Sequence, residues 1–292
     1  MFNKMLSKGS RWTREAMHHL SGRWSRVQGV TRRKHKPELI VSLTTIPERA
    51  IKVVCCIDSL LRQSVKPDRV ILWVSESRGL NKSEMRTGAI AESLQRLEGR
   101  GLEIRWCEDI GSYRKLIPTM REHPDAIVVT ADDDLMYPRH WLKALYGAYE
   151  KEPAYIHCHL AHLMLHGSNG ALLPYRQWKF GAPGVGEARM DLFPTGGGGA
   201  LYAPGHLDPE VLNESAFLSL SPRADDVWFK AMSLKRGVAC KKVAADSISI
   251  PALKIPGNRS LFPENVAGGG NDRQIAAVNE RYGVFGEIDQ GR

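Results

Sequence analysis

The stretch that decides the fold is AIVVTADDD at residues 126–134, an apolar run that ends in three carboxylates. Its β-branched residues predict a buried strand, because such side chains pack well inside a parallel sheet. Three adjacent negative charges repel one another, so the end of this strand needs either solvent or a compensating cation. The stretch therefore predicts a core strand with a candidate cation or ligand site at its carboxyl end.

The rest of the body alternates between strand and helix patterns. Strands are expected at residues 38–45 (ELIVSLTT), 69–75 (RVILWVS) and 102–106, and helices at 50–63, 83–97, 113–122, 138–150 and 224–236. We expect Pro118 to interrupt the helix at 113–122, because proline cannot donate a helical hydrogen bond. The alternation predicts an α/β fold with a mostly parallel sheet flanked by helices.

Polar residues follow several of the predicted strands. Thr44 and Thr45 end the first, Ser75 ends the second and the aspartate triplet ends the fourth. Ligands of open parallel sheets bind outside the carboxyl ends of the strands. We therefore expect these residues to surround one ligand site.

The positive charge of the chain is concentrated at one end. Residues 1–36 contain ten Lys or Arg and a single acid, whereas the whole chain has a net charge of +9, so the remainder is neutral. A neutral body argues against a general nucleic-acid binder. Apolar residues of the leader, including Trp12 and Trp24, mostly fall on one helical face. This spacing suits a basic amphipathic helix at an anionic membrane surface, although a solvated tail is the alternative.

Cysteine usage and hydropathy indicate where the protein works. The five cysteines have no CxxC spacing, which argues against a disulfide framework or a zinc site and favours a reducing compartment. The sequence has no apolar run long enough to span a bilayer. We expect a cytoplasmic protein, with peripheral contact at the inner face of the membrane through residues 1–36.

The aspartate triplet fits a divalent cation. Oxygen ligands suit Mg²⁺ or Mn²⁺, and Mg²⁺ usually binds one or two carboxylates together with substrate phosphates. In an extended segment residues i and i+2 share a face, so Asp132 and Asp134 can act together. A solvated acidic turn is the alternative interpretation. Four histidines, His157, His159, His162 and His166, are weaker metal candidates and are expected mainly to pack or to contact an acceptor.

Two further motifs follow downstream. Residues 194–202 (PTGGGGALY) contain four glycines, which allow a substrate to approach the backbone closely. Residues 224–228 (ADDVW) place Asp225 and Asp226 at the start of a helix. Carboxylates there stabilise the helix dipole, and one of them can also serve as a general base toward an acceptor hydroxyl.

The ordered set TTIPxR, AIVVTADDD, the glycine stretch and ADDVW resembles the GT-A fold glycosyltransferases, in particular bacterial family 2-like enzymes of surface polysaccharide synthesis. The resemblance covers roughly residues 38–255. It leaves out residues 1–37, a basic leader that we expect to lie on a membrane surface or to be disordered, and residues 256–292, a C-terminal segment that we expect to be partly mobile.

The resemblance implies a metal-dependent transfer of sugar from a nucleotide-diphosphate donor, favouring UDP-sugars, to a glycan or lipid-linked acceptor. Asp132 or Asp133 would contact the donor's ribose or the metal, Asp134 would bind Mn²⁺ or Mg²⁺, and Asp225 or Asp226 would be the base. The other implied roles are donor binding by Thr44, Thr45, Arg49 and Lys115, and acceptor binding by Gly197, Gly198 and Gly199.

Two other functions compete with this one. A sugar nucleotidyltransferase shares the metal chemistry but should have a glycine-rich loop after its first strand, and residues 43–49 contain no glycine. A non-catalytic membrane or nucleic-acid binding protein would act through the leader alone. The P-loop pattern GxxxxGK[ST] is absent from the sequence.

Overall fold

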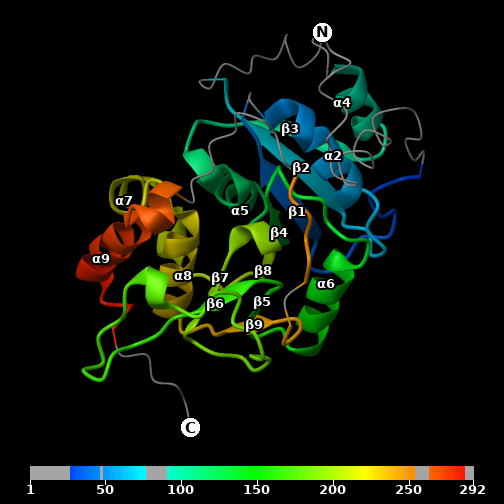
Figure 1. Ribbon diagram of the computed structural model, residues 1–292. Coiled ribbons are helices and arrows are strands. Elements are labelled where there is room, and N and C mark those ends of the chain that lie inside the picture. Colours follow the sequence, from blue (N-terminus) through cyan, green and yellow to red (C-terminus); the bar gives the residue numbers. More distant parts are fainter. Residues whose placement is uncertain (1–26, 47–48, 77–90, 247, 254–262, 287–292) are drawn as a thin grey trace, which may run out of the picture.

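The computed structural model describes residues 27–46, 49–76, 91–246, 248–253 and 263–286, without the side chains of residues 50–52 and 263. Its centre is a seven-stranded sheet in the order β3-β2-β1-β4-β8-β5-β9 (Figure 1). The bounds are β1 (Leu39–Thr44), β2 (Arg69–Val74), β3 (Leu102–Trp106), β4 (Ile127–Ala131), β5 (Ile156–Cys158), β8 (Ala200–Tyr202) and β9 (Cys240–Lys242). Of these strands only β8 runs antiparallel to its neighbours. The predicted α/β fold with a mostly parallel sheet is confirmed.

Seven α-helices are described around the sheet. They are α2 (Ala50–Leu60), α4 (Ala91–Glu98), α5 (Ile117–Glu122), α6 (Trp141–Lys151), α7 (Glu214–Leu220), α8 (Asp225–Arg236) and α9 (Gly270–Tyr282). Shorter helical turns are η5 (Gly111–Lys115), η6 (Tyr175–Gln177), η7 (Gly196–Gly198), η8 (Pro209–Leu212) and η9 (Pro263–Ala267). A separate pair of short strands joins β6 (Ala161–Leu163) to β7 (Leu192–Pro194).

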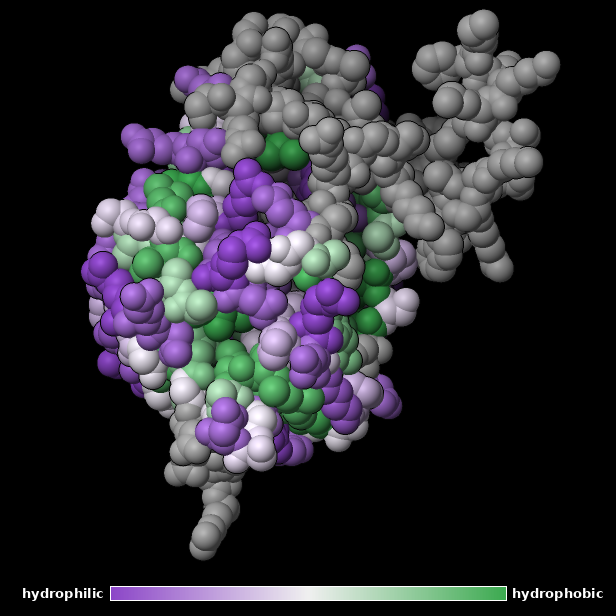
Figure 2. Space-filling model, turned by 60° about the vertical axis from the view of Figure 1, so that its left-hand side comes forward, coloured by the Kyte–Doolittle hydropathy of each residue, from purple (hydrophilic) through white to green (hydrophobic). Residues whose placement is uncertain are grey.

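The helices cover both faces of the sheet. One hydrophobic core joins β1, β2 and β4 to α2, α4 and α6, and a second joins β4, β5 and β8 to α5, α8 and α9. Figure 1 shows α7, α8 and α9 grouped on one side of the sheet, away from α2 and α6. Burial on both faces explains why the strands β1, β2 and β4 read as nearly continuous apolar runs. Polar and apolar residues are interspersed on the face in Figure 2, as is usual for a folded domain.

Local sequence signals explain most of the helix boundaries. The helix predicted at 113–122 is divided in two, because η5 ends at Lys115 and α5 begins at Ile117, the residue before Pro118. The expected interruption is therefore present, and Pro118 is at the start of the second helix. It lies in the first turn of α5, where its missing N–H has no helical partner to lose. The helix predicted at 83–97 is described only over α4, and its first part lies outside the described residues. Helix α8 ends at Gly237, whose φ of 75° is the left-handed conformation of a glycine C-cap.

The C-terminal part of the chain contributes to the core. The side chains of Ile275 and Val278 on α9 and of Phe285 are at most 6% exposed and belong to the same hydrophobic cluster as α8. The boundary proposed at residue 255 stays a prediction, since residues 254–262 lie outside the description.

The strand order fixes where a ligand can bind. From β1 the chain proceeds to β2 and β3 on one side, then returns to place β4 on the other side of β1. Connections that leave adjacent strands in opposite directions open a crevice at their carboxyl ends. In this sheet that point lies between the ends of β1 and β4, where Thr45 and the aspartate triplet are found.

Candidate active site at the ends of β1 and β4

The carboxylate of Asp133 ties the ends of β1 and β4 together. Its Oδ2 accepts a hydrogen bond of 2.6 Å from Thr45 Oγ1, and its Oδ1 accepts one of 2.8 Å from Arg49 Nη1. Asp133 is 4% exposed, and burial raises the pKa of its carboxyl against the opposing effect of Arg49. Asp133 therefore has a structural part in shaping the site, with both oxygens already engaged.

Asp132 and Asp134 remain accessible on either side of it. Their side chains are 34% and 29% exposed. Asp134 Oδ2 lies 3.4 Å from Arg49 Nη1, so this guanidinium is shared between two of the three aspartates. The backbone N–H of Asp132 donates to the hydroxyl of Tyr137, which in turn donates to the carbonyl of Gly197. The triplet is thus fixed to the glycine stretch through Tyr137.

Lys115 joins the two acidic motifs. Its Nζ donates a hydrogen bond of 2.9 Å to Asp132 Oδ1 and lies 3.1 Å from Asp225 Oδ2. The second contact is an ion pair outside hydrogen-bond geometry. Lys115 is 5% exposed; burial alone would lower the pKa of its ammonium, but the charges of Asp132, Asp225 and Asp226 raise that pKa well above its usual value. A charged lysine therefore bridges β4 and α8.

The amino end of α8 supplies the second pair of carboxylates. Asp225 is 7% exposed, and Asp226 is half-buried with its Oδ1 accepting a 3.0 Å hydrogen bond from Gly196 N–H. Burial and the neighbouring charge of Asp225 raise the pKa of Asp226 to about 7. A carboxyl with a pKa near neutrality is suited to accept a proton at physiological pH. Helix capping by the side chains is not observed, because the N-cap residue Ala224 has no side-chain acceptor.

The four glycines at residues 196–199 form two pairs with different surroundings. A Cβ at Gly196 would stand 2.4 Å from Lys115 Nζ, and one at Gly197 would stand 3.1 Å from Asp132 Oδ2. These two glycines face the charged cluster. Gly198 and Gly199 instead pack against Leu160 and the Trp141 ring, and Trp141 Nε1 donates to the Gly198 carbonyl.

The structure brings together most of the residues that the sequence singled out. Arg49, Asp132, Asp133, Asp134, Lys115, Asp225 and Asp226 form one connected set, with Thr45 and Gly197 at its margin. Thr44 turns away, since its Oγ1 donates to the carbonyl of Trp73. The acceptor role of Gly198 and Gly199 stays a prediction, although both face the protein interior. The structure adds Tyr137 and Gly196 to the predicted site residues. The only sequence signal for them is that Tyr137 lies near the aspartate triplet and Gly196 belongs to the glycine stretch.

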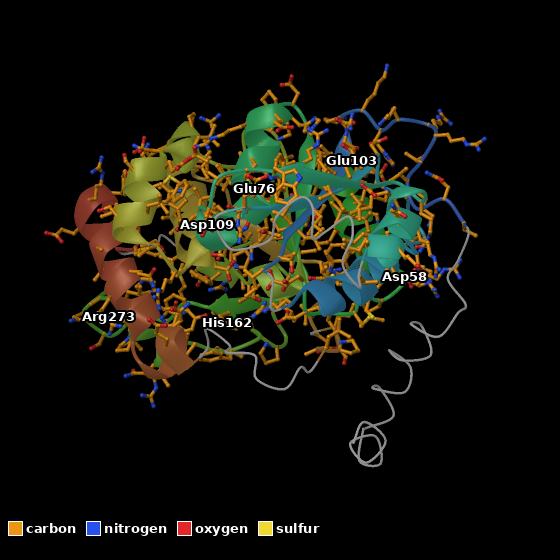
Figure 3. All side chains as sticks on the ribbon, turned by 90° about the horizontal axis from the view of Figure 1, so that it is seen from above. Asp58, Glu76, Glu103, Asp109, His162 and Arg273 are labelled. Carbon is orange, nitrogen blue, oxygen red and sulfur yellow. The ribbon has the colours of Figure 1, made fainter. Side chains whose placement is uncertain are left out.

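The histidines belong to the packing of the core. His157 and His159 pair with the backbone carbonyls of Glu152 and Trp141, and His162 accepts from the N–H of Gly181. Burial lowers the pKa of His162 to about 4, which keeps the ring neutral. His162, labelled in Figure 3, extends from β6 and contacts the rings of Tyr175 and Phe180. Within the described ranges, no group of three or more His, Cys, Asp or Glu side chains is arranged around a metal position.

Comparisons with known proteins give no family assignment. No family model matches the chain, and no curated protein matches it. Among solved structures, one similar chain is the mannosyltransferase PcManGT from Pyrobaculum calidifontis, in complex with GDP-Man and Mn²⁺. The two are 12% identical, with a TM-score of 0.45 over 92% of this chain and 80% of the other. A likeness at this level carries no conclusion about function.

Replacing Gly196 by alanine should disturb the lysine bridge. The new Cβ meets an ammonium that two carboxylates hold in place, so we expect a loss of about 1–3 kcal/mol in the free energy of unfolding. Gly147→Ala in α6 is the matched control: a Cβ there meets nothing within 4 Å. Alanine favours helix, so this variant should gain about 0.5–1 kcal/mol. Urea denaturation of both variants measures these changes in the free energy of unfolding. Equal stability of the two variants would refute the tight fit at Gly196.

The raised pKa of Asp226 makes stability depend on pH. The carboxyl ionises near pH 4 in the unfolded chain but only at about 7 in the folded protein. The stabilisation that the protonated carboxyl adds to the free energy of unfolding is therefore complete below about pH 4 and is lost as the pH rises toward 7. Relative to Asp226→Asn, which stays neutral, the wild type should lose on the order of a few kcal/mol between these values. If the unfolding free energies of the wild type and of Asp226→Asn changed with pH in the same way, the pKa of Asp226 would not be raised in the folded protein.

Proposed function

We propose that the protein is a nucleotide-sugar glycosyltransferase of the GT-A type, transferring a sugar from a nucleoside-diphosphate donor to an acceptor hydroxyl. The observation that supports this most strongly is the Lys115 bridge between Asp132 and Asp225. Sugar transfer needs groups that neutralise a leaving diphosphate beside a base that deprotonates the acceptor. The bridge holds the start of α8, where Asp226 follows Asp225, close to Asp132 at the end of β4.

The donor would occupy the crevice at the ends of β1 and β4. Arg49 is 20% exposed and presents a guanidinium next to Asp134, and Thr45 lies beside it. In the proposal this edge holds the nucleotide and its diphosphate. We favour a UDP-sugar, as the resemblance of the sequence implies, but the chemistry of these residues suits any nucleoside diphosphate.

A divalent cation fits two of the carboxylates. Asp132 and Asp134 are both partly exposed, lie two residues apart, and flank the inward-facing Asp133. Two carboxylates are a common protein contribution to a Mg²⁺ site completed by substrate phosphates. We propose that these residues hold Mn²⁺ or Mg²⁺ together with the donor, the cation supplying charge neutralisation for the departing diphosphate. Among the described residues they have no third carboxylate or histidine beside them in a metal-binding arrangement.

Asp226 is the better candidate for the base. Asp225 is more buried and already paired with Lys115, whereas Asp226 is half-buried and has a pKa of about 7. In the proposed reaction the acceptor hydroxyl gives its proton to Asp226, while the Gly196 N–H holds that carboxylate in place. Asp225 and Lys115 are positioning residues that keep α8 in register with β4. A glycan or lipid-linked acceptor would approach from the side of Gly197.

Asp134→Ala should abolish metal-dependent donor turnover. The side chain is 29% exposed and, among the described residues, is paired with Arg49 at 3.4 Å, so the fold should survive. We expect Mn²⁺-dependent release of nucleoside diphosphate, screened over a set of nucleotide sugars, to fall by about a hundredfold or more. The control is Asp125→Ala, which removes an exposed aspartate beyond the opposite end of β4.

Metal binding gives an independent readout of the same variant. Mn²⁺ together with a nucleoside diphosphate should raise the melting temperature of the wild type and of Asp125→Ala, but not that of Asp134→Ala. An Asp134→Ala protein that keeps full turnover, or a wild type that works in excess chelator, would contradict the metal role.

Asp226→Asn should lower kcat by about 10²–10⁴-fold and leave the KM for the donor nearly unchanged, as expected for a general base. The wild type should lose kcat as the pH falls below about 7, because Asp226 becomes protonated. Asp225→Asn should instead alter KM and kcat together, because it loosens Lys115. The test is a kcat profile over pH for both variants; an acidic limb that persists in Asp226→Asn would assign the base elsewhere.

A further inference from the structure

The chain after β9 returns to the aspartate triplet. We call residues 248–253 the strap, and its last three residues pair antiparallel with residues 134–136 (orange in Figure 1). The N–H of Leu253 donates a hydrogen bond of 2.7 Å to the backbone carbonyl of Asp134. A second bond of 2.9 Å runs from the N–H of Met136 to a strap carbonyl. The strap is therefore bonded directly to the third aspartate.

Apolar side chains hold the strap in place. Ile250 and Leu253 pack against the hydrophobic core of β1, β2 and β4, as does Leu135 on the other side of the pair. Ser249 and Ala252, by contrast, are exposed. An extended segment with one face on the protein shows such an in-and-out pattern. The bond to the triplet is thus part of a packed arrangement.

Different parts of the chain hold the three aspartates. The backbone carbonyl of Asp132 accepts a bond of 3.1 Å from the thiol of Cys56 on α2. Asp133 is held through its carboxylate by residues that follow β1. The carbonyl of Asp134 is bonded instead to the strap. The first half of the chain therefore fixes the first two aspartates, and the second half fixes the third.

The bond to the strap matters because the side chain of Asp134 is held loosely. Its carboxylate is 29% exposed and lies 3.4 Å from Arg49 Nη1, whereas bonds of 2.6 and 2.8 Å hold the carboxylate of Asp133. A cation site needs ligands at nearly fixed distances, and the partners that orient those ligands change the affinity for the metal. Holding the peptide of Asp134 fixes the point from which its carboxylate extends.

We propose that the strap is a positioning element of the cation site, in which the N–H of Leu253 holds Asp134 where its carboxylate can share a divalent cation with Asp132. The inference rests on the metal role proposed above for these two aspartates. Lys115 and the aspartates of α8 are held by their own ion pairs and hydrogen bonds. Loss of the Leu253 bond should therefore weaken metal binding and leave proton transfer intact.

Three variants of the strap separate the hydrogen bond from other changes. Leu253→Pro removes the N–H, and proline favours an extended conformation at the preceding residue, which Ala252 already has in the bridge. Ala252→Pro is the matched control, because the two bonds of the pair flank this exposed residue and do not use its N–H. Leu253→Ala shortens the side chain and keeps the N–H.

The first measurement is Mn²⁺ binding to the full-length protein with UDP or GDP present, with free Mn²⁺ followed by electron paramagnetic resonance. Leu253→Pro should bind Mn²⁺ about 10–100-fold more weakly than the wild type. Ala252→Pro and Leu253→Ala should bind it like the wild type. In turnover, Leu253→Pro should raise the Mn²⁺ concentration for half-maximal rate by the same factor and keep kcat at saturating Mn²⁺. A general loss of folding would lower kcat at every Mn²⁺ concentration.

Amide hydrogen exchange tests the bond in the wild type, without a substitution. If the bond favours metal binding, metal binding must favour the bond by the same factor. Mn²⁺ with UDP or GDP should therefore slow the exchange of the Leu253 N–H. The N–H of Gly29, bonded to the Arg100 carbonyl just before β3, should exchange at an unchanged rate.

The outcomes distinguish this inference from the proposed function. A wild type that binds Mn²⁺ and turns over, beside a Leu253→Pro variant of equal affinity, would overturn the role of the strap and leave the function standing. Equal weakening in Ala252→Pro, or no slowing of exchange at Leu253, would overturn it as well. A wild type that binds no Mn²⁺ would overturn the metal role itself, and this inference with it.

Discussion

The candidate site depends on one interaction: a buried lysine ammonium is paired with carboxylates from two elements that are far apart in the chain. Lys115 reaches Asp132 at the end of β4 and Asp225 at the start of α8. An unpaired buried charge costs several kcal/mol, so each partner stabilises the others only while all stay in place. Gly196 and Gly197 leave room for this cluster, and the Gly196 N–H donates to Asp226 beside it. The proposed chemistry depends on the same arrangement, because Lys115 keeps Asp132 close to the pair Asp225 and Asp226.

Much of the first half of the fold is encoded locally. The strands β1, β2 and β4 are five or six residues long and almost fully buried, so each is visible as an apolar run followed by polar residues. The second half is harder to predict because β5 to β9 are three-residue strands, too short to show a periodicity. Their pairing depends on contacts between segments far apart, such as β8 inserting between β4 and β5.

The candidate site shows the same division. The sequence could identify acidic motifs, because triplets and pairs of aspartate at the ends of elements are local features. It could not show that Lys115 lies beside Asp225, which is 110 positions later in the chain. Nor could it show that both oxygens of Asp133 accept hydrogen bonds from Thr45 and Arg49. Those partners depend on where the sheet brings its strand ends. Gly198 and Gly199 cannot be told apart from Gly196 and Gly197 in the sequence. In the structure, however, they pack against Leu160 and Trp141 and not against the charged cluster.

Residues 27–36 are attached at the amino ends of the strands, where Gly29 N–H donates to the Arg100 carbonyl and Thr31 N–H to the Pro67 carbonyl. This attachment bears on how the protein can be handled. An affinity tag or a fluorescent fusion joined directly to Val27, in place of residues 1–26, would start at the amino ends of the strands, whereas the candidate site lies at the carboxyl ends of β1 and β4. A fusion after α9 would lie closer to the candidate site, because α9 packs on α8. The first turn of α9 is also tied to the rest of the domain, since Asp272 accepts a hydrogen bond from the backbone N–H of Tyr175. Immobilisation on a sensor chip through Val27 of such a shortened chain is therefore the orientation that leaves the candidate site facing the flowing sample.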